Sequence, residues 1–365
     1  MISRRAIGLG LLGLSVAGTA AYLALGNRPG ALGSLGKIDK LFGFSGGEKQ
    51  ALLANPAVIS AIAGFGLALD ARQAGSVEMV REQALLSQNP QFLWPATSIL
   101  TELARKSGVR VHKDEPIFSS PLVVYSWTSV ADALEKKGFV TKLSGDQRAL
   151  DMAKLLQAMI DRKTWADMGV TDLYGRVRMV STDPTRSNSG FAFAGLAANL
   201  LNGDVVTADK LGAVQPRVGA IFESMGFKPP SSGKLFDDYI NGGPGVLPLA
   251  VGYENQLVEW ILADPARWQK VNATSADKPI ILYPTPSVFA THPLIAIDAR
   301  ADRLIEALLS AAIQKIAWEN HGFRGPLGAT AGDLPARFGV SLPARITSIM
   351  PMPDADTMLR MVGLA

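Results

Sequence analysis

The chain has 365 residues, of which 48% are hydrophobic and 19% charged, and its formal net charge is +4. This composition excludes a disordered polymer and leaves room for two ordinary domains. No run of Lys and Arg accompanies the small net charge, so a nucleic-acid partner is not expected. The lack of cysteine excludes disulfides, thiolate metal sites, a lipid-modified cysteine and a cysteine nucleophile.

An uncharged apolar segment, residues 6–26, follows Arg4 and Arg5 near the N-terminus. As a helix that rises about 1.5 Å per residue, it would span roughly 30 Å, the thickness of a hydrocarbon core. The two arginines favour a cytoplasmic N-terminus and export of everything after residue 26. A cleaved signal peptide and a twin-arginine signal are the alternatives, and both also export the chain. We predict an exported protein, periplasmic or on the extracytoplasmic face, tethered by an N-terminal membrane helix.

Beyond residue 40, short apolar runs alternate with helical patterns, which is typical of α/β architecture with mostly parallel sheets. Asn55 and Pro56 begin a predicted helix that Gly64 or Gly66 ends, because these residue types favour the two ends of a helix. The next segment, residues 65–71, predicts a strand. The chain therefore starts as alternating strands and helices.

Two extended stretches interrupted by proline, residues 117–125 and 280–297, are expected to pass between two environments. Between them, residues 176–203 and 245–262 each predict a strand, a polar turn and an apolar helix. This layout predicts one lobe built from both ends of the chain and a second lobe inserted in it, with hinges and a cleft between. The predicted segments are a signal or anchor at 1–36, a first lobe at 37–120 with 286–365, and a second lobe at 121–285.

The pattern G-x-S-x-G at residues 43–47 places Ser45 where a serine hydrolase can carry its nucleophile. That role needs a sheet before the serine, yet at most one short strand precedes Ser45. His292 and His321 follow later, so an exported serine hydrolase stays an alternative. A serine flanked by glycines at a strand-to-helix turn also offers a hydroxyl and free backbone N–H groups to an anion or a hydroxyl-rich ligand. We favour this binding turn and predict no enzymatic activity.

A second polar turn, residues 181–190, crowds hydroxyl and amide side chains before an apolar helix, with Arg186 nearby. Helix caps and turn formers account for one or two such residues, but the density of the cluster indicates a binding turn. No cofactor or metal is predicted, because the three histidines are isolated and no phosphate-binding or dinucleotide fingerprint occurs.

Several blocks occur in the order found in a known family, among them GFSGGEKQALLANPAV, FSSPLVVYSWTSVADAL, MVSTDPTRSNSGFAFAGLAANLLNG, VGYENQLVEW and THPLIAID. From about residue 41 to residue 325, the chain resembles bacterial extracellular solute-binding proteins of the type II periplasmic-binding-protein superfamily. The resemblance implies a two-lobed α/β fold, with a hinge between the lobes, that closes on a small polar ligand. It favours an oxyanion or a small carboxylate as the ligand.

Carried over position by position, the resemblance implies a ligand held by turns and strands at the cleft. These residues are Ser45, Gly46 and Gly47 in the first-lobe turn, Ser119, Ser120 and Tyr125 in the extended crossing, Asp183, Thr185, Ser187, Asn188 and Ser189 in the second lobe, and Tyr253 and Asn255 in the later turn. Glu48 departs from the pattern, because an acidic residue beside Ser45 repels an anion unless Lys49 or Arg186 offsets its charge or it points away.

The expected partner is a membrane transporter or an envelope complex, and the expected state is a monomer. The alternative outside transport is an envelope protein whose binding-protein fold serves a protein partner. The segment after Leu334 lies outside the resemblance, and its role has no interpretation from the sequence.

Overall fold

The computed structural model describes residues 38–143, 145–274, 277–326 and 341–364. Lys40–Ala365 form one compact unit. The predicted membrane helix at residues 6–26 lies outside the described residues. Within the described ranges, no helix is long and apolar enough to cross a membrane.

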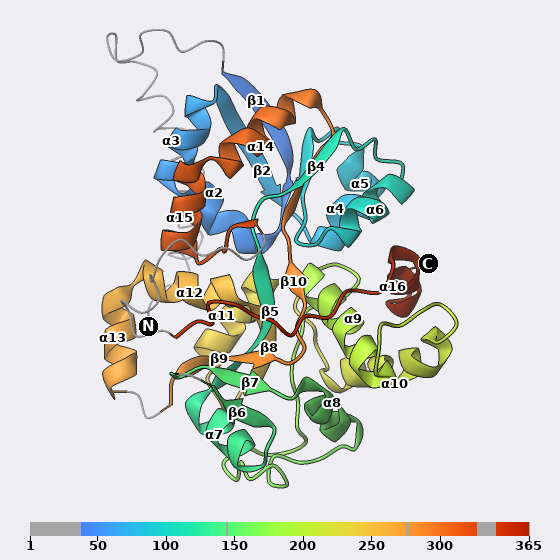
Figure 1. Ribbon diagram of the computed structural model, residues 1–365, viewed down its shortest axis with the longest axis vertical. Coiled ribbons are helices and arrows are strands. Elements are labelled where there is room, and N and C mark those ends of the chain that lie inside the picture. Colours follow the sequence, from blue (N-terminus) through green and yellow to red (C-terminus); the bar gives the residue numbers. More distant parts are fainter. Residues whose placement is uncertain (1–37, 144, 275–276, 327–340, 365) are drawn as a thin grey trace, which may run out of the picture. The chain divides into compact units, whose positions relative to one another are not determined.

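The first lobe is built on a mixed sheet whose described strands follow the order β2, β1, β3, β11, β4 (Figure 1). Strands β1 and β3 are parallel, whereas β11 runs antiparallel to β3 and β4. The strand that comes from late in the chain thus joins a sheet formed by its beginning. The bounds are β1 (Asp39–Ser45), β2 (Leu67–Gln73), β3 (Phe92–Trp94), β4 (Lys113–Pro116) and β11 (Pro293–Ala296).

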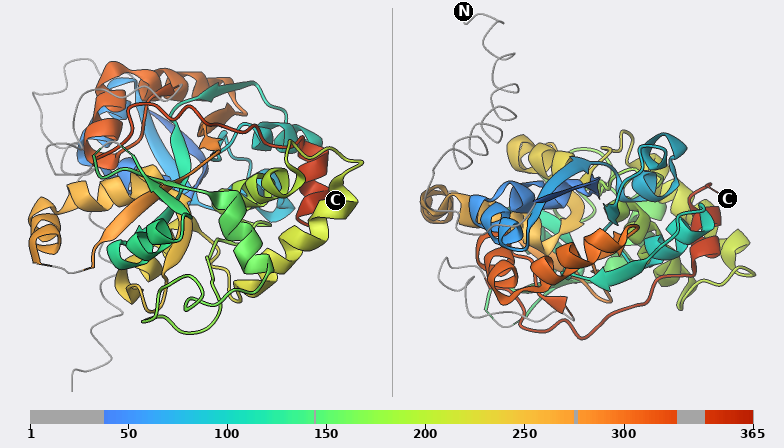
Figure 2. Two further views of the ribbon diagram at one scale, coloured as in Figure 1. Left: turned by 60° about the horizontal axis from the view of Figure 1, so that its bottom comes forward. Right: turned by 90° about the horizontal axis from the view of Figure 1, so that it is seen from above.

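Helices cover both faces of this sheet (Figure 2). The alternation of strand β3 explains the two layers, since Phe92 and Trp94 lie in one hydrophobic cluster and Leu93 in the other. The cluster of Phe92 and Trp94 includes side chains from α2 (Gln50–Ala54), α3 (Pro56–Gly64), α14 (Asp302–Leu309) and α15 (Ala311–His321). The cluster of Leu93 includes α4 (Ser76–Arg81) and α6 (Ile99–Lys106), with α5 (Gln83–Leu86) packed beside it.

The second lobe contains a sheet ordered β10, β5, β9, β7, β6, with β8 paired to β5. The prediction of mostly parallel sheets is wrong here, because β5 runs antiparallel to β8, β9 and β10, and β6 runs antiparallel to β7. The chain enters this lobe along β5 and returns along β9, so neighbouring strands run in opposite directions. The bounds are β5 (Ser120–Trp127), β6 (Val140–Lys142), β7 (Arg148–Leu150), β8 (Leu249–Tyr253), β9 (Pro279–Pro284) and β10 (Phe289–Ala290).

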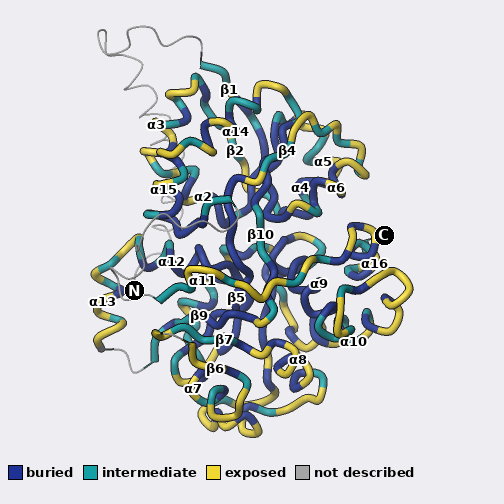
Figure 3. Tube along the Cα trace, in the orientation of Figure 1, coloured by how far each residue is buried: buried dark blue, intermediate teal, exposed yellow. Residues whose placement is uncertain are grey.

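Helices pack around this second sheet, and its strands are buried along most of their length (Figure 3). The predicted strand near residue 178 is instead irregular chain that joins β8 through a single bridge between Val180 and Ala250. The helices are α7 (Thr128–Lys136), α8 (Met152–Ile160), α9 (Asn188–Asn202), α10 (Leu211–Ser224), α11 (Ser232–Gly242), α12 (Glu254–Ala263) and α13 (Pro265–Thr274).

A buried ion pair fixes the chain where it crosses between the lobes. Arg324 pairs with Ser119 as a β-bridge, and its guanidinium donates to both carboxylate oxygens of Glu254 at 2.6 and 2.9 Å. The Tyr283 hydroxyl donates to the same carboxylate at 2.7 Å. Since Glu254 is the first residue of α12, these contacts fix the start of that helix beside the crossing. The predicted residue boundaries of the lobes stay a prediction.

The C-terminal segment, which has no interpretation from the sequence, contacts both lobes. Its helix α16 (Ala355–Met361) packs against α6 of the first lobe and against α9 and α10 of the second. Met358 is fully buried there. Lys106 forms an ion pair with Asp356, and Gln215 donates to the Arg360 carbonyl at 2.7 Å. The C-terminal segment therefore connects a helix of the first lobe with helices of the second.

The crossing gives a stability prediction. Replacing Arg324 with Met leaves the Glu254 carboxylate buried without its cation, so the free energy of unfolding should fall by about 3–5 kcal/mol. Arg105→Met, which breaks an exposed ion pair with Asp114, should cost less than about 1 kcal/mol. Urea unfolding measures both, and equal losses in the two variants would contradict a special role for the buried pair.

Candidate ligand-binding site

The predicted binding turn lies at the end of β1, where Ser45 is followed by a short 3-10 helix, η1 (Gly47–Lys49), and then α2. Ser45 is fully buried, and its Oγ accepts a hydrogen bond from Gln50 Nε2 at 2.9 Å. A Cβ at Gly46 would lie 2.4 and 2.5 Å from the two carboxylate oxygens of Glu48, so a side chain at this position would force that carboxylate to move. The turn therefore folds the Glu48 carboxylate back over the Gly46 backbone.

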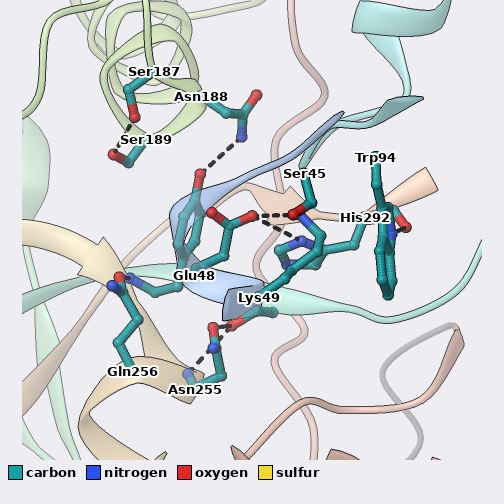
Figure 4. A network of polar contacts seen from close by, with 12 residues as sticks. Ser45, Glu48, Lys49, Trp94, Ser187, Asn188, Ser189, Asn255, Gln256 and His292 are labelled. Carbon is teal, nitrogen blue, oxygen red and sulfur yellow. Dashed lines mark hydrogen bonds and ion pairs between the residues drawn. The ribbon is translucent and has the colours of Figure 1, made fainter. Parts of the chain in front are cut away.

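The Glu48 side chain is buried, and its carboxylate contacts the Lys49 ammonium. Lys49 Nζ lies 2.5 Å from Glu48 Oε1, and His292 Nδ1 lies 3.5 Å from the same oxygen. The Lys49 ammonium also lies 5.5 Å from the centre of the Trp94 ring. Lys49 is 0% exposed and Glu48 6%. Figure 4 shows these side chains together, with dashed lines joining the Glu48 carboxylate to Lys49 and His292.

The electrostatics of this cluster follow from burial and pairing. Burial raises the pKa of Glu48, but the Lys49 and His292 side chains lower it more, so its pKa lies below the ordinary value. Burial lowers the pKa of Lys49, and the Glu48 carboxylate partly restores it. Burial and the Lys49 charge lower the pKa of His292 to about 4. At neutral pH the imidazole of His292 is therefore neutral, and Glu48 and Lys49 form the salt bridge beside it.

Two helix N-termini of the second lobe meet at this cluster. Asn188 is the first residue of α9 and Tyr253 is the N-cap of α12, and Asn188 Nδ2 donates to the Tyr253 hydroxyl at 2.9 Å. The Tyr253 ring packs edge-on against His292, with ring centres 5.9 Å apart. Contacts therefore run continuously from the second lobe through Tyr253 and His292 to Glu48.

Two amide atoms in this region are buried without a partner. Asn188 Oδ1 and Asn255 Nδ2 make no hydrogen bond to any described residue, although Asn188 is 2% exposed and Asn255 fully buried. Asn255 Oδ1, by contrast, accepts from Ser120 Oγ at 3.0 Å. Because buried polar atoms are nearly always paired, one free acceptor and one free donor indicate where a polar molecule can bind.

Other residues of the predicted set lie near the cluster but have internal partners. The Tyr125 hydroxyl donates to the Tyr253 carbonyl at 2.6 Å and accepts from the Tyr253 amide at 2.9 Å, so it positions that residue. Ser189 Oγ lies 2.7 Å from Thr182 Oγ1 and 3.4 Å from Ser187 Oγ. Ser119 is buried, and its Oγ has no hydrogen-bond partner within the described chain.

Asp183 and Thr185 form a tight turn at the edge of the second lobe. Asp183 Oδ1 accepts from the Thr185 amide at 2.9 Å and from its hydroxyl at 2.7 Å. The turn docks on α4 of the first lobe, where the Val77 amide donates to the Arg186 carbonyl at 3.0 Å and Arg186 pairs with Glu78. Gly47 also lies between the lobes, near Gln73 and Ser231. The ligand role of these residues stays a prediction.

Sequence reasoning missed the central members of the cluster. His292 and Trp94 have no local signal, because they approach the turn from distant parts of the chain. Lys49 has a signal, since adjacent opposite charges follow the glycines at 46 and 47. A cavity of about 600 Å³ lies elsewhere in the second lobe, among residues that include Trp165, Tyr174, Arg176 and Arg178. No predicted site residue lines it.

The geometry gives no support to Ser45 as a nucleophile. Its hydroxyl is bonded to Gln50, and no histidine in the described ranges bonds to it. His292 faces Glu48, and His321 contacts Asn55 and Glu259. No group of three or more His, Cys, Asp or Glu side chains that could hold a metal ion occurs among the described residues.

The buried imidazole predicts a pH dependence. The pKa of His292 lies near 4 in the folded chain and has an ordinary value of 6.5, so the unfolded chain takes up the proton first as the pH falls. Stability should therefore drop by about 2 kcal/mol between pH 6.5 and pH 4.5 from His292 alone. Glu48, whose pKa is also lowered by folding, should add to the loss as the pH approaches its ordinary value of 4.5.

Denaturant unfolding at the two pH values measures this loss, and His292→Asn is the matched variant because His292 has a positive φ of 41° that Asn tolerates. The variant should lose stability overall but show a flatter pH dependence. An unchanged dependence would mean that other groups cause it.

No protein-family model matches the chain, and no curated protein matches its sequence. Solved structures do match its fold. A periplasmic thiamin binding protein is 12% identical, with a TM-score of 0.57, and the match covers 91% of this chain and 98% of that one. The sulfate-binding protein SubI from Mycobacterium tuberculosis is 15% identical, with a TM-score of 0.52, over 89% of this chain and 96% of that one.

The periplasmic binding protein AfuA from Actinobacillus pleuropneumoniae, solved with fructose-6-phosphate, is 11% identical, with a TM-score of 0.55, over 89% of this chain and 96% of that one. At these identities the likeness concerns the fold, and each match spans nearly the whole of the other chain. The resemblance noted in the sequence is thus confirmed at the level of the fold: the chain has the two-domain α/β fold of the periplasmic binding proteins.

Proposed function

We propose that this chain is an extracytoplasmic binding protein that captures a small polar solute between its two lobes. The observation that carries the proposal is that Asn188 Oδ1 and Asn255 Nδ2 are buried without a partner in the described chain, in the polar region that also contains the buried Lys49 (Figure 4). Polar atoms of this kind are expected to find a partner. The fold supports the proposal, because the matched structures are a thiamin binding protein, a sulfate-binding protein and a binding protein solved with fructose-6-phosphate.

An oxyanion or a small carboxylate is the favoured solute class. Lys49 supplies a cation, Asn255 supplies amide N–H groups, and the N-termini of α9 and α12 add positive partial charge. The site has few free counter-charges, since Glu254 is neutralised by Arg324 and Arg186 by Glu78. A small anion that binds Lys49 would therefore be held largely by dipoles, which is how helix N-termini bind anions.

The proposal includes export and a partner. The apolar segment at residues 6–26 would carry the compact unit across the membrane and tether it there, and a membrane transporter or envelope complex would receive the solute from a monomeric binding protein. No enzymatic activity is proposed, since Ser45 lacks a basic partner in the described chain.

A second candidate function, an envelope protein whose binding-protein fold serves a protein partner, is favoured by one observation. The cleft between the lobes contains the chain's own Glu48 and Lys49, and α16 contacts helices of both lobes. A protein of this kind would stay closed and bind no solute. The two functions therefore differ in whether any small molecule stabilises the folded chain.

Calorimetric titration of the full-length, dialysed chain with oxyanions, small carboxylates, amino acids and sugars tests the proposal. One anionic class should bind, and Lys49→Met should weaken that binding by about 2–3 kcal/mol because a charge-assisted hydrogen bond is lost. Asn255→Ala should weaken it by about 1–3 kcal/mol.

Lys315→Met is the matched control, because Lys315 is exposed and pairs with Glu319 within α15, so its loss should leave binding unchanged. If wild type and Lys49→Met bind the solute with the same affinity, the solute does not bind at Lys49. No binding by any member of the panel would favour the second function.

A further inference from the structure

The Glu48 carboxylate lies where an anionic ligand of Lys49 would lie. It belongs to the first-lobe turn, but it is enclosed by residues from several elements: Lys49 beside it, His292 from the segment between β10 and β11, and Tyr253 from the second lobe. It is 6% exposed, so the surrounding residues separate it from water. A carboxylate gives up strong hydration on burial, and a cation in contact must compensate for that loss.

The turn is built to hold this carboxylate. Gly46 leaves room that any side chain would fill, since a Cβ at that position would lie within 2.5 Å of both Glu48 oxygens. Oε1 accepts a hydrogen bond from Lys49 and lies 3.5 Å from His292 Nδ1, which has no hydrogen-bond partner in the described chain. The Lys49 ammonium packs against the Trp94 ring, and within the described chain it donates its hydrogen bond to Glu48. Glu48 therefore supplies the charge that makes burial of Lys49 possible.

We propose that Glu48 is a built-in ligand of the cleft, whose carboxylate occupies the position on Lys49 that the anionic group of a solute takes on binding. This inference rests on the proposed function, and it adds how the site is regulated. With Glu48 in place the lobes close without a solute. A solute must displace Glu48 from Lys49, because two carboxylates on one ammonium would leave an unpaired negative charge in a buried site.

The inference also narrows the solute. Its anionic group must be of carboxylate size, because it replaces a carboxylate that fits between Gly46 and Lys49. Glu48 must then leave the pair, and opening of the lobes returns it to water, since Tyr253 and Asn188, which help to enclose the cluster, belong to the second lobe. Solute binding is thus an exchange of one carboxylate for another, and its net affinity is lower than that of an uncontested site.

Chemical rescue tests this exchange directly. Glu48→Ala removes the carboxylate, leaves Lys49 without its partner and opens a space of carboxylate size. Acetate should then raise the thermal midpoint of Glu48→Ala by several degrees relative to sodium chloride at the same ionic strength, because it binds the folded state alone. Acetamide, a neutral molecule of the same shape, should have no effect, and wild type should respond much less than the variant.

The double variant Glu48→Ala/Lys49→Met is the matched control and should not respond to acetate. A response of this double variant equal to that of Glu48→Ala, or an equal response to acetate and to sodium chloride, would overturn the inference. If Glu48→Ala does not fold, Glu48→Gln keeps the shape of the side chain and removes its charge. It should bind the solute found for wild type roughly tenfold more tightly, since the competitor is gone. Unchanged affinity would contradict the proposal.

The outcomes separate the two claims. Rescue of Glu48→Ala by acetate, together with a wild-type chain that binds no solute, would show that the position on Lys49 accepts a free carboxylate, but it would reject solute capture and therefore the exchange. The opposite result has three parts: wild type binds an anion at Lys49, Glu48→Ala does not respond to acetate, and Glu48→Gln binds with unchanged affinity. It would support solute capture and reject the built-in ligand.

Discussion

Burial of one ion pair between two lobes is the constraint on which the proposed site depends. An ammonium and a carboxylate can leave water only when they meet each other and further polar groups. The turn after β1 supplies both charges, at Glu48 and Lys49, and the rest of the chain encloses them. His292 contacts the carboxylate, Tyr253 packs against His292, and Asn188 bonds to Tyr253. Each lobe thereby contributes one wall of a single polar cluster.

A second buried ion pair, between Arg324 and Glu254, fixes the position of the second-lobe residues at this cluster. Arg324 and Glu254 are separated by 70 positions in the chain, yet they join the crossing between the lobes to the first residue of α12. Ser119 and Tyr283 add backbone and hydroxyl contacts at the same point. Because Tyr253 and Asn255 flank Glu254, the crossing between the lobes also fixes residues of the proposed site. The contacts that stabilise the crossing therefore also position residues of the proposed site.

Local patterns predicted local structure well. Asn55 and Pro56 begin α3 as expected, with Asn55 Oδ1 accepting from the Ala57 amide at 2.9 Å. Gly203, in the left-handed region, ends α9 close to its expected end. The order of the strands was not predictable in the same way, because β11 and β4 pair across nearly two hundred residues and nothing in either strand specifies its neighbour. The missing strand near residue 178 has the same cause, since pairing with distant residues decides whether an extended run becomes a strand.

The candidate site shows a similar division. Ser45 and Tyr253 stand where a strand leads into a helix, and Asn188 is the first residue of α9; the sequence placed all three at turns before helices and so near the predicted cleft. Their hydrogen-bond partners were not predicted. The Ser45 hydroxyl accepts from Gln50 close by in the chain, and the Tyr253 hydroxyl accepts from the distant Asn188, so a hydroxyl in the sequence need not be free to bind a ligand. The role of Lys49 depends on His292 and Trp94, which lie far away in the chain.

The central claim is that the cleft around Lys49 receives the anionic group of a small solute. A crystal structure of the full-length chain with the solute that stabilises it most tests this claim directly. The account predicts a carboxylate or oxyanion within hydrogen-bond distance of Lys49 Nζ, with Glu48 displaced from that ammonium and Asn255 Nδ2 or Asn188 Oδ1 newly paired. A solute bound instead in the cavity beside Arg176 and Arg178, with the Glu48 and Lys49 pair intact, would contradict it.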